Sequence, residues 1–186
     1  MSEIVNRCKW VNMKNPLYIQ YHDTEWGKPQ HSDRVLFELL ILEGFQAGLS
    51  WECVLNKREH FRQVYDSFDV EKVGRYDEAK IQELLADPGI IRNRLKVQAS
   101  VTNAKAFLQI QKEFGSFDTY IWSFTQGKTV YESYDVRTAS PLSDQISKDL
   151  KKRGMKFVGS TVIYSYLQAI GVVDGHGSEC DCHKLE

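Results

Sequence analysis

Two predicted helices and the tight turn between them indicate the fold, and they lie in residues 151–171, KKRGMKFVGSTVIYSYLQAIG. This stretch is typical of a helix that ends at Gly154, a turn over residues 155–158, and a second helix that begins at Gly159. Glycines let the backbone turn sharply, and the first amides of a helix point outward, ready for an anion. With basic residues such as Lys156 around the turn, this is the layout of a helix-hairpin-helix, which grips a DNA phosphate through main-chain N–H groups. The alternative is an ordinary corner between two helices, because two glycines five residues apart are common.

Working outward, the rest of the chain also predicts helices, because apolar residues recur at helical spacing between glycine and proline breaks. Ser50, Asp69 and Asp77 stand at expected N-cap positions, and either Ser32 or Asp33 can cap the helix that follows it. The expected helices cover residues 33–46, 51–65, 70–76, 78–87, 92–114, 117–124, 143–153 and 160–170. Residues 128–138 alternate like a strand, with a loop as the alternative. The sequence therefore predicts an all-α fold with short connections.

Length and composition place the chain among ordinary globular proteins. Its 186 residues, 42% hydrophobic and 26% charged, suit one well-cored domain over residues 1–186 or two small lobes that share a core. No apolar run reaches the roughly 18 residues of a membrane helix, and the first ten residues lack the apolar core of a secretion signal. We therefore expect a cytosolic protein without a membrane role. The closing Leu185–Glu186 is typical of a cloning remnant.

The charge distribution says more than the total. The net charge of −1 gives no overall basic excess of the kind that nucleic-acid binders often carry. Two basic clusters nevertheless stand out, and the first runs into the glycine turn of residues 154–159. A solvated helix face is the alternative for both of them. The clusters comprise Lys148, Lys151, Lys152, Arg153 and Lys156, and then Arg92, Arg94 and Lys96.

Aromatic residues crowd the N-terminal segment. Four aromatic residues fall within seventeen positions: Trp10, Tyr18, Tyr21 and Trp26. This density is typical of a core but also of a pocket that stacks on a flat ligand.

Glu43 ends an apolar helical run. Its carboxylate is therefore either turned to water at the helix end or buried with partners.

A short link, AGLS, joins two predicted helices directly after this run. It carries Gly48 and Leu49, a leucine with no obvious core partner, and Trp51 follows at the start of the next helix.

The chain ends carry metal-ligating residue types. His176 and Cys180 form an H-x3-C pair near the C-terminus, and Cys8 and His22 are natural candidates for the remaining ligands. Such a Cys2His2 set is a common closed structural zinc type, and it would join the two ends of the chain and contribute folding energy. Cytosolic cysteines seldom form disulfides, which favours ligation or burial. Cys182 and His183 are competing ligands, whereas Cys53 is expected to pack within a helix.

Seven ordered blocks together resemble the bacterial 3-methyladenine DNA glycosylase I family, over nearly the whole chain. The blocks are RCKWV, NPLYIQYHDTEWG, LFELLILEGFQAGLSW, VLNKREHFR, GIIRNRLKVQA, ISKDLKKRGMKFVGSTVIYSYLQAIG and DGHGSEC. Blocks of this length in this order are far more specific than any single pattern above.

The resemblance implies an all-α helix-hairpin-helix glycosylase with one structural Zn²⁺ bound by Cys8, His22, His176 and Cys180. It implies a pocket in which Glu43 and Tyr21 hydrogen-bond the excised base and Trp51 stacks on it, with Trp10, Tyr18 and Trp26 completing the wall. Gly48 and Leu49 match the segment that fills the gap in the DNA stack. The hairpin that anchors a phosphate would comprise Gly154, Lys156, Gly159 and Ser160.

Two positions depart from the wider glycosylase superfamily. Members that also cleave the strand carry a Schiff-base lysine two residues after the second hairpin glycine, where this chain has Thr161, so lyase activity is not expected. Most members also place a catalytic aspartate downstream of the hairpin. Asp174 is near that place, but it adjoins an expected zinc ligand, and we do not assign it that role.

The expected function is therefore excision of N3-methyladenine from alkylated double-stranded DNA by a monomeric, monofunctional enzyme. The cationic lesion has a weakened glycosidic bond, so extrusion into a stacking pocket with suitable hydrogen bonds is expected to suffice. One alternative is a zinc hydrolase, which a closed four-ligand site opposes because no position remains for water. The other alternative is a non-catalytic DNA-binding module that a zinc ion stabilises.

Overall fold

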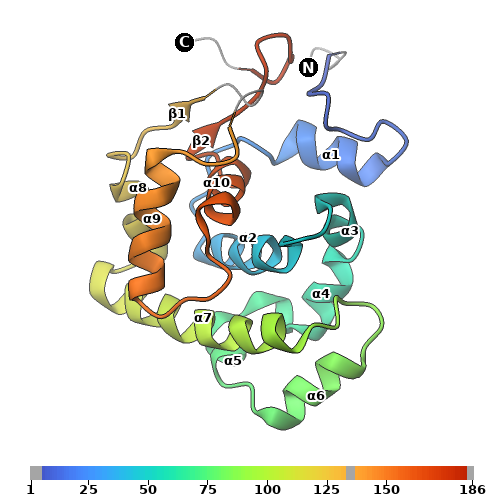
Figure 1. Ribbon diagram of the computed structural model, residues 1–186, viewed down its shortest axis with the longest axis vertical. Coiled ribbons are helices and arrows are strands. Elements are labelled where there is room, and N and C mark those ends of the chain that lie inside the picture. Colours follow the sequence, from blue (N-terminus) through green and yellow to red (C-terminus); the bar gives the residue numbers. More distant parts are fainter. Residues whose placement is uncertain (1–5, 133–136, 184–186) are drawn as a thin grey trace.

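The computed structural model describes residues 6–132 and 137–183, and helices dominate this part of the chain (Figure 1). The prediction of a mostly helical fold is confirmed. The α-helices are α1 (Pro16–Thr24), α2 (Asp33–Gln46), α3 (Trp51–Leu55), α4 (Arg58–Val64), α5 (Val70–Gly74), α6 (Glu78–Ala86), α7 (Arg94–Phe114), α8 (Phe117–Ser123), α9 (Pro141–Lys152) and α10 (Ser160–Ala169). A 3-10 turn, η1 (Asp66–Phe68), and two short strands, β1 (Val130–Tyr131) and β2 (Val173–Asp174), complete the elements.

Side-chain caps start several helices where the sequence predicts them. Ser50 accepts a hydrogen bond from the Cys53 amide at 3.2 Å and so caps α3. Asp69 and Asp77 cap α5 and α6 in the same way. Ser32 occupies the N-cap position of α2 but makes no side-chain cap bond.

The structure differs from the expected elements in three places. The helix predicted over residues 51–65 is divided into α3 and α4 at Asn56 and Lys57. Helix α9 begins two residues earlier than expected, at Pro141, because Ser140 and Ser143 form a reciprocal capping box. Helix α1 was not predicted, although Asn15 caps it and proline follows at its first position.

The stretch expected to alternate as a strand does so only in part. Val130 pairs in parallel with Val173, and Tyr131 with Asp174, so that β1 and β2 form a two-residue ladder. Residues 133–136 of that stretch lie outside the described residues, as do Leu185 and Glu186.

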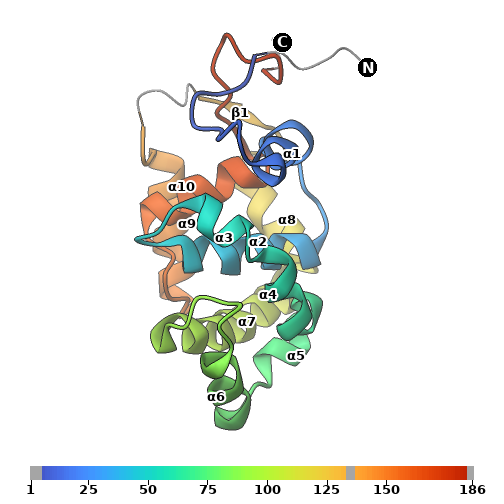
Figure 2. The same ribbon diagram turned by 90° about the vertical axis from the view of Figure 1, so that its right-hand side faces the viewer.

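The core is built around α2, which lies between α10 and α7 in Figure 1. All side chains from Leu36 to Phe45 are buried, so the helix has no solvated face over that run. Helix α9 packs on α10, and α5 on α7. At the end of the molecule opposite α6, helix α1 lies beside the segment that follows β2, in both Figure 1 and Figure 2. Two chain segments distant in sequence therefore meet there.

Among the described residues, no helix combines the length and the apolar composition that crossing a membrane requires.

Candidate functional site: an aromatic pocket, two turns and a Cys/His cluster

A pocket opens between α1, α2, α3 and α10. It encloses about 620 Å³ that no protein atom fills, including its open mouth. All six residues that the sequence predicts as base-binding line it, and three unpredicted residues join them. The lining comprises Trp10, Tyr18, Tyr21, Trp26, Glu43, Gln46, Trp51, Ser165 and Gln168.

Helical spacing explains why these side chains converge. Tyr18 and Tyr21 are one turn apart on α1, and Ser165 and Gln168 are one turn apart on α10. Ring contacts then hold the wall together. The ring centroids of Trp10 lie 5.3 Å from Tyr18 and 4.8 Å from Trp26, and those of Tyr21 and Trp51 lie 5.3 Å apart. The pocket is therefore a chamber whose aromatic walls also carry the polar side chains of Glu43, Gln46, Ser165 and Gln168.

Glu43 is the acidic residue in the lining of this chamber. It is only 3% exposed, so the alternative of a helix-end carboxylate turned to water is wrong. Its carboxylate makes no hydrogen bond or ion pair to any residue that the structure describes, and burial raises the pKa of its carboxyl to about 8. Burial, followed by the neighbouring Glu43, also raises the pKa of the Tyr21 hydroxyl well above its usual value. A buried carboxylate without a partner is costly, which is typical of a group that awaits a ligand.

Two residues that line the same chamber carry buried hydrogen-bond donors. The indole N–H of Trp51 and the amide Nε2 of Gln168 have no hydrogen-bond partner in the part of the chain that the structure describes. Gln168 is 4% exposed, and sequence reasoning missed it. A glutamine inside the apolar run IYSYLQAIG was the signal that could have found it.

An ion-pair network behind the pocket fixes the position of α1. The buried Arg58 guanidinium contacts Glu25, just after α1, at 2.7 Å, and Glu38 of α2 at 2.5 Å. Arg62 also pairs with Glu38. Because these groups join α1, α2 and α4, they hold Tyr21 against the pocket.

The turn between α2 and α3 carries the predicted Gly48 and Leu49. Gly48 adopts a φ of +79°, a conformation that favours glycine, and a side chain there would meet open space. Leu49 is 41% exposed at the tip of this turn. Gln46 donates a side-chain hydrogen bond to the Leu49 carbonyl at 2.8 Å, which stiffens the loop beside the pocket.

The turn between α9 and α10 has the predicted outline. Gly154 follows α9 with a φ of +93°, and Gly159 precedes α10 as its N-cap, without a side-chain cap bond. Gly159 has an ordinary φ of −61°, and an added Cβ would meet no atom within 4 Å. Neither backbone strain nor internal packing therefore requires glycine at this position. Lys156 and Thr161 are exposed near the turn, and Ser160 begins α10.

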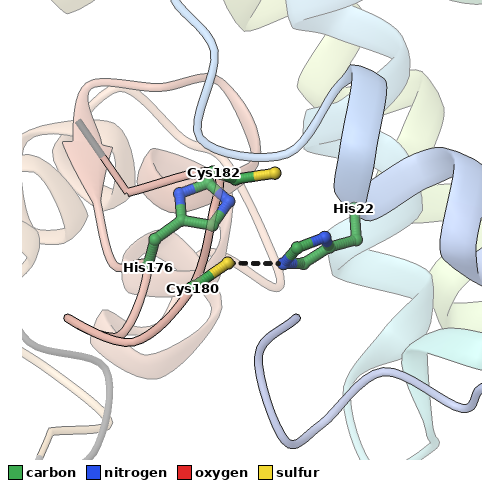
Figure 3. Close-up of side chains that lie close together, drawn as sticks. All are labelled: His22, His176, Cys180 and Cys182. Atoms are coloured by element: carbon green, nitrogen blue, oxygen red, sulfur yellow. Dashed lines mark hydrogen bonds between the residues drawn. The ribbon is translucent and has the colours of Figure 1, made fainter. Parts of the chain in front are cut away.

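A Cys/His cluster joins α1 to the segment after β2, as Figure 3 shows. It consists of His22, His176, Cys180 and Cys182, whose ligand atoms all lie within 4.8 Å of one another. The sequence predicted three of these four residues together with Cys8. Cys182 takes the place of Cys8 in this group.

The hydrogen bonds around the cluster suit a metal ion. His22 Nδ1 lies 2.8 Å from Asp23, and His176 Nδ1 lies 2.7 Å from Asp174, which leaves the Nε2 atoms as ligands. His22 Nε2 faces the Cys180 sulfur at 3.5 Å, and His176 Nε2 is buried without a partner among the described residues. Two imidazoles and two thiols give the four donors that a tetrahedral zinc site requires.

Cys8 remains close enough to compete for the fourth position. Its amide donates to His22 Nε2 at 3.4 Å. Burial raises the pKa of its thiol to about 12, and the neighbouring Cys180 adds to that shift. Burial likewise raises the pKa of Cys182 to about 11. His183 is not part of the group of four.

The cluster and the pocket share a wall. The ring of His176 lies 4.5 Å from that of Trp26, and the ring of His22 lies 5.3 Å from that of Trp10. Disturbing the cluster should therefore disturb two of the aromatic residues that line the chamber.

Comparison with known proteins gives a consistent result. The profile of a family described as methyladenine glycosylase matches residues 10–184. The chain is 46% identical to DNA-3-methyladenine glycosylase 1 of Escherichia coli (strain K12), covering 96% of this chain and 97% of that protein. It is 42% identical to DNA-3-methyladenine glycosylase of Haemophilus influenzae, covering 96% and 98%.

Solved structures agree with these relatives. A crystal structure of 3-methyladenine DNA glycosylase I superposes with a TM-score of 0.92 at 45% identity, covering 96% of this chain and all of that one. A tyrosine-to-phenylalanine variant of such an enzyme in complex with 3-methyladenine also gives 0.92, at 35% identity over 98% of this chain and all of that one. The Staphylococcus aureus enzyme gives 0.89 at 36% identity over 94% and 95%. The chain belongs to the methyladenine glycosylase family.

Proposed function

We propose that this protein is a monofunctional DNA glycosylase that rotates N3-methyladenine out of alkylated duplex DNA and hydrolyses its N-glycosidic bond. The observation that carries this proposal is the aromatic chamber with a buried, unpartnered carboxylate at Glu43. Membership of the methyladenine glycosylase family supports the same activity, since the relatives carry that activity in their names.

The chamber fits the hydrogen-bonding pattern of the methylated adenine. Glu43 accepts from the N6 amino group, which guanine lacks at that position, and so separates the two purines. Trp51 stacks on the base, and an indole face also attracts a cation, by roughly 0.5–2 kcal/mol. Tyr21 provides a further hydrogen bond. Gln168 lines the chamber and its amide Nε2 has no partner among the described residues, which supports a role for it as a donor to a ring nitrogen of the bound base.

The chemistry requires little further help from the chain. Methylation at N3 makes the nucleotide cationic, so the bond to C1′ breaks with its electron pair going to a base that departs neutral. Water then adds to the cationic C1′ and releases a proton to solvent, which leaves a neutral abasic site. A chamber that holds the departing base lowers the barrier by favouring the separated state over the intact nucleotide.

We do not expect the enzyme to cleave the DNA strand by lyase activity. A lyase needs an amine nucleophile to form a Schiff base with the sugar. The corresponding position in the first turn of α10 is Thr161, which cannot form one.

The two turns supply the DNA surface. The first amides of α10, near Gly159 and Ser160, bind a phosphate, with Gly154 and Lys156 shaping the approach. Leu49 fills the gap that the extruded base leaves in the stack, and Gly48 lets the strand come close. We propose that residues 1–186 act as one domain and as a monomer on chromosomal DNA in the bacterial cytoplasm.

We also propose one structural Zn²⁺ per chain. His22, His176 and Cys180 bind it, and either Cys8 or Cys182 completes the set. Four protein ligands would leave no position for water, so a bound ion would stabilise the fold rather than activate water.

Measuring the bases released from alkylated duplex DNA tests the function. We expect free 3-methyladenine, an abasic product with an intact strand, and no covalent trapping by borohydride. Release of no base, with duplex binding retained, would instead support the alternative of a non-catalytic DNA-binding module. A trapped enzyme–DNA adduct would contradict the assignment of Thr161.

A further inference from the structure

Helix α7 contacts both of the turns that the proposed function places against DNA. Lys96 and Asn103 are seven residues apart on this helix, which is two helical turns or roughly 10 Å along one face. Each makes two hydrogen bonds, Lys96 to backbone around the α2–α3 turn and Asn103 to the α9–α10 turn. The proposed DNA surface does not include either residue.

Lys96 fixes the end of α2. Lys96 is 8% exposed, and its ammonium donates to the carbonyl oxygens of Phe45 at 2.8 Å and of Ala47 at 2.7 Å. Those carbonyls lie at the C-terminal end of the helix, where a cation is favoured by both hydrogen bonding and the helix dipole. The next residues are Gly48 and Leu49. Lys96 therefore sets the direction in which the chain leaves α2.

Asn103 fixes the second turn. Its side-chain oxygen accepts from the Lys156 amide at 2.8 Å, and its side-chain nitrogen donates to the Lys156 carbonyl at 2.9 Å. This pair of bonds holds both backbone groups of one residue, next to Phe157 with its φ of +54°. The turn then leads directly into Gly159 and the first amides of α10.

The two turns also meet α2. A Cβ built on Gly44 of that helix would lie 3.6 Å from Phe157 Cβ, so α2 approaches the α9–α10 turn closely. Gly44, Lys96, Asn103 and Phe157 line one small cavity. The end of α2, the middle of α7 and the α9–α10 turn therefore form one packed unit.

We propose that Lys96 and Asn103 are positioning residues, which together set the distance between the Leu49 turn and the phosphate-binding turn. This inference rests on the proposed function for the meaning of the two turns. Lys96 acts on excision through Leu49, and Asn103 acts on duplex binding through the amides at the start of α10. Neither residue touches the base chamber, so the affinity for the free base does not depend on them.

The first experiment compares Lys96→Met, Lys96→Arg and Lys112→Met with the parent. Lys112 is an exposed lysine near the other end of α7 and serves as the matched control. We expect Lys96→Met to lower single-turnover excision from duplex DNA by about tenfold or more, because a charged donor to two carbonyls is lost. Its dissociation constant for free 3-methyladenine should stay within about twofold of the parent value. Lys96→Arg retains the donors and should recover most of the activity.

The second experiment compares Asn103→Leu and Asn103→Asp. We expect Asn103→Leu to weaken binding to damaged and undamaged duplexes alike by about tenfold, because it loosens a phosphate contact that carries little sequence information. Asn103→Asp keeps the acceptor for the Lys156 amide and should fall between Asn103→Leu and the parent. Circular dichroism and thermal melting show that each variant is folded.

Amide hydrogen exchange separates this inference from the proposed function. Peptides over residues 45–51 should exchange faster in Lys96→Met, and peptides over residues 154–160 faster in Asn103→Leu, whether or not the protein excises any base. A parent that releases no base would remove the proposed function alone. Unchanged exchange together with unchanged excision, or an equal loss of free-base affinity, would overturn the positioning role.

Discussion

At the scale of the single residue, the proposed function depends most on Glu43. Its carboxylate lies in an apolar helix with no partner among the described residues, and it faces a chamber of aromatic rings. Packing alone would favour a leucine there. The cost of burying the acid is therefore offset only when a ligand donates to it, as we propose that the N6 amino group of adenine does.

Replacing Glu43 with glutamine tests this role. A hydrogen bond to a charged group is worth about 1.5–3 kcal/mol. At a pH above 8, where the Glu43 carboxyl is ionised, we therefore expect Glu43→Gln to lose roughly ten- to a hundredfold in affinity for free 3-methyladenine. Titration calorimetry measures this loss, with circular dichroism as the fold control. Glu83→Gln changes an exposed glutamate of α6 in the same way and should bind like the parent. Equal dissociation constants for Glu43→Gln and the parent would remove Glu43 from the site.

The raised pKa of Glu43 also predicts a pH dependence of stability. Its carboxyl has a pKa of about 8 in the folded protein and about 4.5 when unfolded, so the folded state holds its proton more tightly. The stability from this group is complete below pH 4.5 and is lost as the pH rises through 8. We expect the parent to lose on the order of 1 kcal/mol per pH unit between pH 5 and 8 relative to Glu43→Gln. Urea unfolding at several pH values measures the difference, and parallel curves would contradict the burial of an acid at this position.

At the scale of the element, the chain was predictable wherever local chemistry decides. The caps at Ser50, Asp69 and Asp77 are bonds within one turn of the chain, and the sequence predicts all three. The break between α3 and α4 was not predictable, because the apolar periodicity runs on through Asn56. Tertiary bonds mark the break instead, from Asn15 to Asn56 and from Lys57 to the carbonyls of residues 88 and 89. Helix α1 was missed because its aromatic residues face the pocket and the cluster rather than following a clear apolar stripe.

The first turn of α10 permits a test of the phosphate contact. An added side chain at Gly159 would meet nothing within 4 Å in the protein and would keep an ordinary φ. Gly159→Val should therefore melt within a few degrees of the parent, but it should weaken binding to damaged and undamaged duplexes alike, by about tenfold. Electrophoretic mobility shifts with both duplexes measure this. Full binding by Gly159→Val would place the DNA surface elsewhere.

The α2–α3 turn should respond differently from the α9–α10 turn. Leu49 is exposed and apolar at the tip of its turn, so truncation costs the fold little. We expect Leu49→Ala to lower single-turnover excision more than initial duplex binding, because the side chain acts only once the base has left the stack. Leu95→Ala, an exposed leucine on α7, is the control. A loss confined to binding would show that Leu49 contacts the intact duplex instead.

At the scale of the whole molecule, the site arises from segments that sequence patterns cannot bring together. The chamber draws on four helices and the loops around them, and ordered blocks resembling a known family identified six of its nine lining residues. Gln46 and Ser165 were missed because each is an ordinary polar position on its own helix, whereas Gln168 was missed although it lies in an apolar run. The sequence also predicted the Cys/His cluster only in part. His22 and His176 were predictable by type, whereas the choice between Cys8 and Cys182 depends on the path of the C-terminal segment.

Helix α1 and the segment after β2 meet at the Cys/His cluster, where we propose a metal ion. We expect about one zinc ion per chain in freshly purified protein, measured by plasma emission spectrometry. Cys180 is 6% exposed and faces His22, so Cys180→Ser should break the link between α1 and the segment after β2. Loss of a structural metal is among the largest single-residue effects, so we expect about 4 kcal/mol or more, or a melting point roughly 10 °C lower.

Comparing Cys8→Ser with Cys182→Ser then identifies the fourth ligand, because only the true ligand should lower both zinc content and melting temperature. Cys53→Ser, a cysteine outside the cluster, is the control for losing a thiol. Chelation should also shift the tryptophan fluorescence of the parent, since the rings of Trp10 and Trp26 pack against the two histidines. Protein that contains no zinc before any chelator is added, and whose melting temperature is the same in Cys180→Ser, would show that the cluster neither binds zinc nor joins α1 to the segment after β2.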